Sequence, residues 1–300
     1  MLNSQSRQSD VKQKCPNQQA LINKNNGFTL LELIIVIIIL GVMSLGITSF
    51  ISLSTQTYLN VSERDDLLSS ARFAIERLNR EIRNAVPNSI RITPITPFTT
   101  QQCIEFIPIK ASTIYTDVPV VPDNKRANVD VVNFVNSQDA PFSSCSGTCP
   151  DYIVVYPLTP SDVYDFDINS GDGKVTQLKP FSGLIGDIWT VPIEPTGGMV
   201  FEQHSPTDRL YVFDSTVSYC VSNFQLKRFQ GSNFEPFQSL TPVGSESLMA
   251  ENVTFDKDDP PFVYSPASLQ RNAVVQIKLN FNRDGEEIVF NNDVHIENIP

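Results

Sequence analysis

The sequence predicts an α+β fold, in which one long N-terminal helix with a membrane-spanning first half packs on an antiparallel β-sheet head. Three observations lead to this prediction. Residues 33–53 are apolar and carry no charge, apolar side chains then recur at helical spacing up to Ala85, and short β-branched and aromatic runs follow Pro87. A long helix followed by antiparallel strands is typical of an α+β layer arrangement.

The apolar run from Leu33 to Leu53 contains 21 residues, which is enough for a helix to cross a bilayer. The preceding residues 1–27 contain four basic residues and one acidic residue, so they are positive, whereas the whole chain has a net charge of −11. A basic leader before an acidic remainder predicts a single-pass protein with its leader in the cytoplasm and its bulk exported. The strong acidity also argues against nucleic acid as a partner.

The helix is expected to continue beyond the apolar run as an amphipathic segment. No Pro interrupts residues 28–86, and Pro87 marks a stop, so we expect one helix of about 55 residues. An alternative is two helices broken near residues 52–60. In the second half, apolar residues recur at three- and four-residue steps and form one stripe that can pack under a sheet. These residues are Leu67, Leu68, Ala71, Ala74, Ile75, Leu78, Ile82 and Ala85.

The region after Pro87 has the pattern of strands separated by turns. Apolar runs bounded by Pro, Gly, Asn and Ser predict strands at residues 104–109, 152–156 and 210–213. The clearest strand is Ala273–Phe281, where apolar and polar residues alternate. Residues 282–285 then predict a turn, residues 286–290 a returning strand, and segments 111–150 and 225–262 look loop-rich.

The most informative motif is Gly-Phe-Thr-Leu-Leu-Glu at residues 27–32, immediately before the apolar run. A secretory signal is cut after its apolar region, behind small residues, so that the apolar part is removed. Here the small residue Gly27 precedes the apolar part. A cut after Gly27 would remove the polar leader and keep the apolar helix. The alternative is an uncut signal anchor that happens to contain Gly-Phe.

This motif resembles the processing site of type IV pilins and type II secretion pseudopilins. The resemblance implies that a prepilin peptidase cuts after Gly27 and methylates the new amine of Phe28. Glu32 would be the fifth residue of the mature chain, a position that is acidic in this family. There its carboxylate would form an assembly salt bridge with the N-terminal amine of a neighbouring subunit. The expected organisation is a leader (1–27), a transmembrane and filament-core segment (28–53), an amphipathic segment (54–86), and a periplasmic or extracellular head (87–300).

Further segments narrow the resemblance to the larger minor pilins, above all those of the mannose-sensitive haemagglutinin (MSHA) pilus. They are residues 71–85, 87–91, 103–108 and 294–300. Pseudopilin J of type II secretion is an alternative. The resemblance implies a minor pilin that primes assembly or sits at the tip. It also implies the inner membrane and then the pilus as locations, and other major and minor pilins, the prepilin peptidase and an inner-membrane assembly platform as partners.

The cysteines predict disulfides in an exported head. Cys15 lies in the leader, and the other four allow three connectivities. We favour a local Cys145–Cys149 bridge and a long-range Cys103–Cys220 bridge.

The sequence has no GxSxG, P-loop or GxGxxG pattern, which are motifs typical of catalytic sites. We therefore expect no enzyme activity, cofactor or metal, although a membrane-anchored periplasmic enzyme or binding domain remains an alternative. Asp165, Asp167 and Asn169 are a weak calcium candidate, because oxygen ligands two residues apart begin an EF-hand loop. The sixth position is Ser170 and the twelfth Thr176, however, which favours an Asx turn. Adhesive binding would be sought in the loop-rich segments.

Overall fold

A computed structural model describes residues 27–94, 101–135, 140–143, 151–267 and 272–296. One helix, α1 (Leu30–Arg83), contains 54 residues and runs without a break through residues 52–60, so the alternative of two helices is wrong. The last turn closes with tighter bonds, in which the Asn84 and Ala85 amides donate to Glu81 and Ile82. The chain divides into two compact units after Ser62, inside α1.

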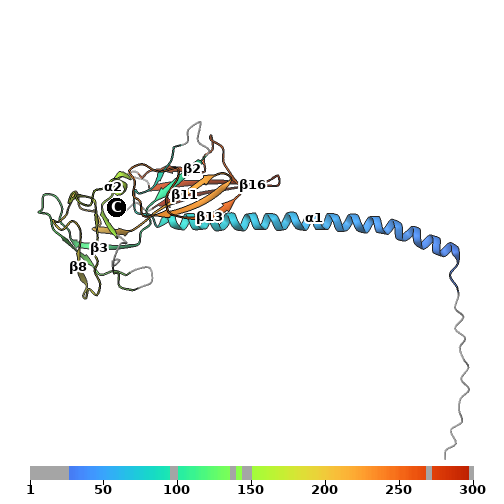
Figure 1. The fold of residues 1–300 in the computed structure, drawn as a ribbon, viewed down its shortest axis with the longest axis horizontal. Helices are drawn as coiled ribbons and strands as arrows, with labels where there is room; N and C mark the ends of the chain where they lie inside the picture. Colours follow the sequence, from blue (N-terminus) through green and yellow to red (C-terminus); the bar gives the residue numbers. More distant parts are fainter. Residues whose placement is uncertain (1–26, 95–100, 136–139, 144–150, 268–271, 297–300) are drawn as a thin grey trace, which may run out of the picture. The chain divides into compact units, whose positions relative to one another are not determined.

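In the second unit, the C-terminal part of α1 provides one wall of the largest core, beside the sheets that contain β2, β11, β13 and β16 (Figure 1). The predicted stripe is confirmed, because seven of its eight residues belong to that core and Leu68 is half-buried. Ala71 and Ala74 are fully buried, and their small side chains let the strands approach the helix closely.

A five-stranded sheet packs on this part of α1 in the order β1-β2-β11-β12-β13. All its neighbours are antiparallel. Its strands are β1 (Arg91–Ile92), β2 (Gln101–Phe106), β11 (Thr216–Ser222), β12 (Gln225–Gly231) and β13 (Ser245–Glu251). Strands β2 and β11 are direct neighbours although more than one hundred residues separate them along the chain. Ile104, Phe106, Val217 and Tyr219 point to the helix, so the alternate residues of β2 and β11 face away from it.

A four-stranded sheet completes the core around α1. Its central strand, β16, pairs with β17 along one edge and with β14 and β15 along the other. The strands are β14 (Val253–Thr254), β15 (Phe262–Ser265), β16 (Ala273–Arg283) and β17 (Glu286–Ile296). Asp284 and Gly285 form the turn between β16 and β17, with φ values of 52° and 88°. Positive φ at both central residues is the property of a type I′ hairpin, which matches the twist of the strands.

The residues between β2 and β11 form a second layered structure with its own core. Its six-stranded sheet has the order β7-β5-β10-β3-β4-β8. The strands are β3 (Ala111–Asp117), β4 (Asn128–Val132), β5 (Tyr152–Val155), β7 (Val175–Gln177), β8 (Ile188–Pro192) and β10 (Arg209–Phe213). A short parallel pair, β6 (Asp172–Gly173) with β9 (Val200–Phe201), and the single-turn helix α2 (Ser161–Tyr164) complete this region.

The carboxylate of Asp162 organises the entry to α2. It accepts hydrogen bonds from the amides of Leu158 and Thr159 at 2.8 and 3.0 Å and an ion pair from Lys174 Nζ at 2.8 Å. Burial alone would raise the pKa of Asp162, but these donors outweigh it and hold the pKa below its ordinary value.

Several predictions need correction. Segments 111–150 and 225–262 contain strands that were not predicted, β3 and β4 in the first and β12, β13 and β14 in the second. Tyr156 lies outside β5, at a positive φ of 52°. Strand β2 starts earlier than predicted, at Gln101, and ends at Phe106. The returning strand β17 continues past residue 290 to Ile296, because β16 pairs with it along its whole length.

Candidate processing and assembly site

The motif at the N-terminus of the described chain forms a capped helix start. Gly27, Phe28 and Thr29 precede α1, and the Thr29 carbonyl accepts the Leu33 amide at 3.2 Å. The Thr29 hydroxyl accepts the Glu32 amide at 3.3 Å, so Thr29 is the N-cap and Glu32 lies at the third helical position. Threonine followed three residues later by glutamate is the capping-box pattern, so the sequence itself carries the signal for this helix start.

The predicted cleavage point is accessible. Gly27 and Phe28 lie outside the helix, and Phe28 is 76% exposed. Non-helical, exposed backbone is the form in which a chain can enter a peptidase site. Glu32 is also exposed, and its position in the first turn suits a carboxylate, because the helix dipole favours negative charge there.

The apolar half of α1 is exposed along its whole length in the isolated chain, from Leu30 to Leu53. It has the length and hydropathy of a membrane span. Three hydroxyls in and next to this segment are satisfied by the helix itself: Ser44, Thr48 and Thr55 donate to carbonyls four residues earlier, at 2.7–2.8 Å. Because these groups need no outside partner, they reduce the cost of placing the segment among apolar neighbours.

The amphipathic half of α1 is fixed to the five-stranded sheet by a partly buried polar network as well as by its apolar stripe. The Glu81 carboxylate accepts bonds from Arg228 Nε of β12 at 2.9 Å, the Tyr219 hydroxyl of β11 at 3.0 Å, and Arg77 Nε at 3.0 Å. Burial, followed by the charge of Glu81, raises the pKa of Tyr219, so this phenol remains a donor. The network sets the register between the helix and two strands.

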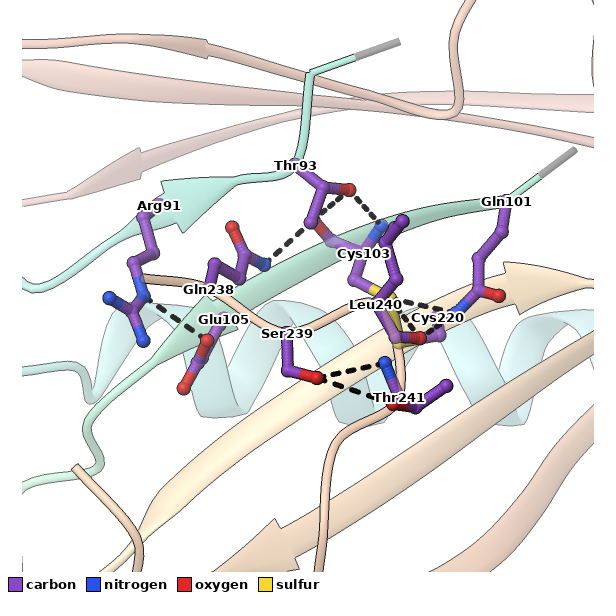
Figure 2. The surroundings of a disulfide bond; sticks show 10 residues. All are labelled: Arg91, Thr93, Gln101, Cys103, Glu105, Cys220, Gln238, Ser239, Leu240 and Thr241. Atoms are coloured by element: carbon purple, nitrogen blue, oxygen red, sulfur yellow. Dashed lines mark hydrogen bonds and ion pairs between the residues drawn. A yellow bond between two sulfur atoms is a disulfide. The ribbon is translucent and has the colours of Figure 1, made fainter. Parts of the chain in front are cut away.

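The disulfide joins Cys103 of β2 to Cys220 of β11, which is the long-range pairing that the sequence analysis favoured. The two residues are directly opposite each other across the sheet, with Cα atoms 4.1 Å apart, on the face that points away from α1 (Figure 2). Cys15, Cys145 and Cys149 lie outside the described residues. The bridge therefore links two neighbouring strands across a sequence separation of 117 residues.

The calcium candidate has the geometry of its alternative, the Asx turn. Asp167 Oδ1 accepts the Asn169 amide at 2.9 Å and its side-chain nitrogen at 3.3 Å, so this carboxylate is used by its own loop. Asp165 follows the end of α2. Within the described ranges, no group of three His, Cys, Asp or Glu residues is arranged to hold a metal ion.

One comparison with known proteins gave a result. The family described as the prokaryotic N-terminal methylation motif matches residues 22–48, which include Gly27, Phe28, Glu32 and much of the apolar helix. No curated protein and no solved structure matches the chain. The motif, together with a long apolar helix that leads into antiparallel sheets, supports a type IV pilin-like or pseudopilin protein. Such a prepilin signal implies processing by a prepilin peptidase and assembly with other pilins and the membrane.

Proposed function

We propose that this chain is a minor pilin of an MSHA-like type IV pilus, most similar to MshO, which acts without enzymatic activity in priming assembly or at the tip. The observation that carries the proposal is the methylation motif placed directly before a continuous, exposed apolar helix. Such a helix can leave lipid for a bundle of similar helices at little hydrophobic cost, because both surroundings are apolar.

The first step would be cleavage after Gly27 and methylation of Phe28. Mass spectrometry of the N-terminal peptide from cells tests it, and we expect methylated Phe28 when the prepilin peptidase is present. A strain that lacks the peptidase is the control and should yield the uncut leader. If the chain retains residues 1–27 in a wild-type strain, it is a simple signal anchor and the proposal fails.

The second step would be pairing of Glu32 with the free amine of a neighbouring subunit. A charged side chain at the centre of a membrane helix costs about 2.5–3.5 kcal/mol. Glu32 lies in the first turn of α1, where the cost is smaller, and a positive partner in the helix bundle would offset it. We expect Glu32→Ala to insert and to be cleaved normally but to enter filaments poorly. Glu76→Ala, on an exposed face of the same helix, is the matched control and should assemble normally. Normal incorporation of Glu32→Ala would contradict the pairing.

Two features favour a minor over a major pilin. Cleavage would leave about 270 residues, which is bulky for a repeating shaft subunit. Major pilins also usually carry Pro near the twenty-second mature position, whereas this chain has Ser49 there, and α1 is continuous through it. Counting subunits in purified pili by quantitative mass spectrometry tests this assignment. A few copies per filament are expected, and thousands would overturn it.

Two alternatives make different predictions. A pseudopilin J-like component would be needed for type II secretion, so its deletion would block secretion of exoproteins and leave surface pili unchanged. A membrane-anchored periplasmic enzyme or binding domain would never polymerise and would keep its N-terminus at Met1. Deleting the gene and then examining pili by electron microscopy and assaying secreted proteins distinguishes the minor pilin, the pseudopilin and the membrane-anchored domain.

A further inference from the structure

The segment between β12 and β13, residues 232–244, is a loop with a closed neck. Gly231 and Gly244 meet at the neck, where a Cβ on Gly231 would overlap the Val243 carbonyl and a Cβ on Gly244 would overlap that of Gln230. Gly244 also has a φ of 151°. A compact surface loop whose ends are in contact is an Ω-loop, a type of loop that is frequently functional.

The Ω-loop lies across the outer face of the five-stranded sheet, over the disulfide (Figure 2). Three side-chain to backbone bonds fasten it there. The Arg91 guanidinium donates to the Pro236 carbonyl at 3.1 Å, and the Gln238 amide donates to the Cys103 carbonyl at 3.0 Å. Gln101 donates to the carbonyl of Leu240. The loop is therefore held in place from both β1 and β2.

A cavity of about 360 Å³ lies between the loop and the sheet. Its floor is polar and buried: Glu105, Thr216 and Ser218 are only 6%, 7% and 3% exposed and all line the cavity. Small-molecule sites have volumes of about 300–1,000 Å³ and combine apolar walls with a few fixed polar groups. The volume of this cavity suits a compact ligand. In its floor, Glu105 Oε2 already accepts Arg91 Nε and the Thr216 hydroxyl donates to the carbonyls of Gly231 and Asn233, so a ligand would meet Glu105 Oε1, the lone pairs of the Thr216 oxygen, and Ser218.

The rim supplies an aromatic ring and further polar groups. Phe237 and Val243 both line the cavity and are 86% and 74% exposed. Asn233, Glu235 and Ser239 add amide, carboxylate and hydroxyl groups. An exposed aromatic face beside many directional hydrogen-bonding groups can stack on the C–H face of a ring while its hydroxyls are bound.

The charges of the cavity disfavour anionic ligands. Among the described residues that line it, Arg91 provides the single positive charge. That charge is already used, because Arg91 Nε lies 3.1 Å from the Glu105 carboxylate and its guanidinium is 3.6 Å from the centroid of the Tyr164 ring. Glu235 leaves the lining with a net negative charge, so phosphate, sulfate and acidic sugars would be repelled.

We propose that this Ω-loop cavity binds a neutral carbohydrate of one or two rings, stacked on Phe237 and hydrogen-bonded to the floor formed by Glu105, Thr216 and Ser218. The inference does not depend on filament assembly, because every residue involved lies in the second unit of the chain. It gives the head a ligand-binding role in addition to that of a structural subunit.

The test uses the full chain, purified in a zwitterionic detergent without a sugar head group. Fluorescently labelled protein is applied to an array of neutral hexoses, N-acetylhexosamines and their disaccharides, with sialylated and sulfated glycans alongside. A positive neutral glycan is then titrated as its free methyl glycoside, with saturation-transfer NMR to identify the sugar face that contacts the protein. Selective binding of neutral glycans is expected.

Phe237→Ala should weaken binding about tenfold or more, since it removes the stacking ring from an exposed position that contributes little to stability. Phe224→Ala, at another exposed phenylalanine that does not line this cavity, is the matched control and should bind normally. Ser218→Ala tests the floor and should also weaken binding. Binding of no neutral glycan, preferential binding of acidic glycans, or unchanged affinity of a folded Phe237→Ala would each overturn the proposal.

Discussion

The network around Glu81 makes a quantitative prediction about how the head holds its helix. Glu81→Gln keeps the shape of the side chain but removes its charge and replaces one acceptor oxygen with a donor nitrogen. The Arg228 side chain, which is 9% exposed, then loses its ion-pair partner at 2.9 Å. Arg228 and the Tyr219 hydroxyl donate to one oxygen of Glu81 and Arg77 donates to the other, so a single amide oxygen can serve only one of these two sets of donors.

The expected loss can be bounded from the burial of both partners. Removing one member of a fully buried ion pair costs about 3–5 kcal/mol, because the other charge stays buried and unpaired. The Glu81 side chain is 19% exposed, so water can reach part of the site. We therefore expect Glu81→Gln to lower the free energy of unfolding by about 2–4 kcal/mol.

The control is the same substitution in an exposed pair. Glu286 lies 3.8 Å from Arg64, and the two side chains are 48% and 57% exposed. Glu286→Gln should cost no more than about 1 kcal/mol. Both ion pairs join the helix to a sheet, so the difference between the two losses of stability reports the effect of burial.

Urea unfolding of the full chain in detergent measures both variants, because urea, unlike guanidinium chloride, does not screen charges. Trp189, the one tryptophan of the chain, reports on the six-stranded sheet. Hydrogen exchange of the α1 amides after residue 63 reports on the helix itself. The reasoning is refuted if Glu81→Gln loses less than about 1 kcal/mol or no more than Glu286→Gln.

Three further predictions concern other parts of the head. The folded-state pKa of Asp162 is depressed, so its contribution to the free energy of unfolding should be fully present above the ordinary Asp pKa of about 3.9 and be lost as pH falls through the lower folded value. Asp162→Asn should flatten that part of a stability-against-pH curve. An unchanged curve would refute the assignment. Thermal unfolding should show that Gly244→Ala costs about 2–5 kcal/mol, because the new Cβ forces the Ω-loop neck apart. Gly285→Ala, with open space at its Cβ, should cost about 1–2 kcal/mol. Equal losses would count against a closed neck. A Cys103→Ser, Cys220→Ser double variant should have a free energy of unfolding about 2–5 kcal/mol lower than that of the oxidised wild type, measured by urea unfolding. An unchanged free energy of unfolding would show that the bridge does not stabilise the head by restricting the unfolded chain.

The parts of the fold that the sequence predicted well have strong periodicity. The helical stripe from Leu67 to Ala85 and the alternation of Ala273 to Phe281 each place apolar residues at a regular spacing, and both patterns face the core as expected. Strand β3 was missed because its buried face consists of Ala111, Thr113 and Tyr115, of which two are small. A buried face of this kind gives almost no hydrophobic signal.

The functional regions also divide into features that a local sequence pattern indicates and features that depend on distant contacts. The motif at Gly27 and Phe28 and the apolar helix are local in sequence, so both could be predicted. The Ω-loop is fixed by contacts such as Gln238 with Cys103, at a separation of 135 residues, and no local pattern indicates such a contact. Thr29 is different, because its capping box was present in the sequence and was overlooked.

The direct pairing of β2 with β11 has a consequence for how this head can vary. The chain leaves the five-stranded sheet after Phe106 and returns beside it at Val217, having built a separate six-stranded layer with its own interior. Because the exit and the return are neighbours, that layer is an insertion that could be shortened, exchanged or removed while the helix and its sheet keep their topology. The cystine beside this insertion holds β2 and β11 together where the chain leaves and re-enters the sheet, so a change in the length of the inserted part need not separate the two strands.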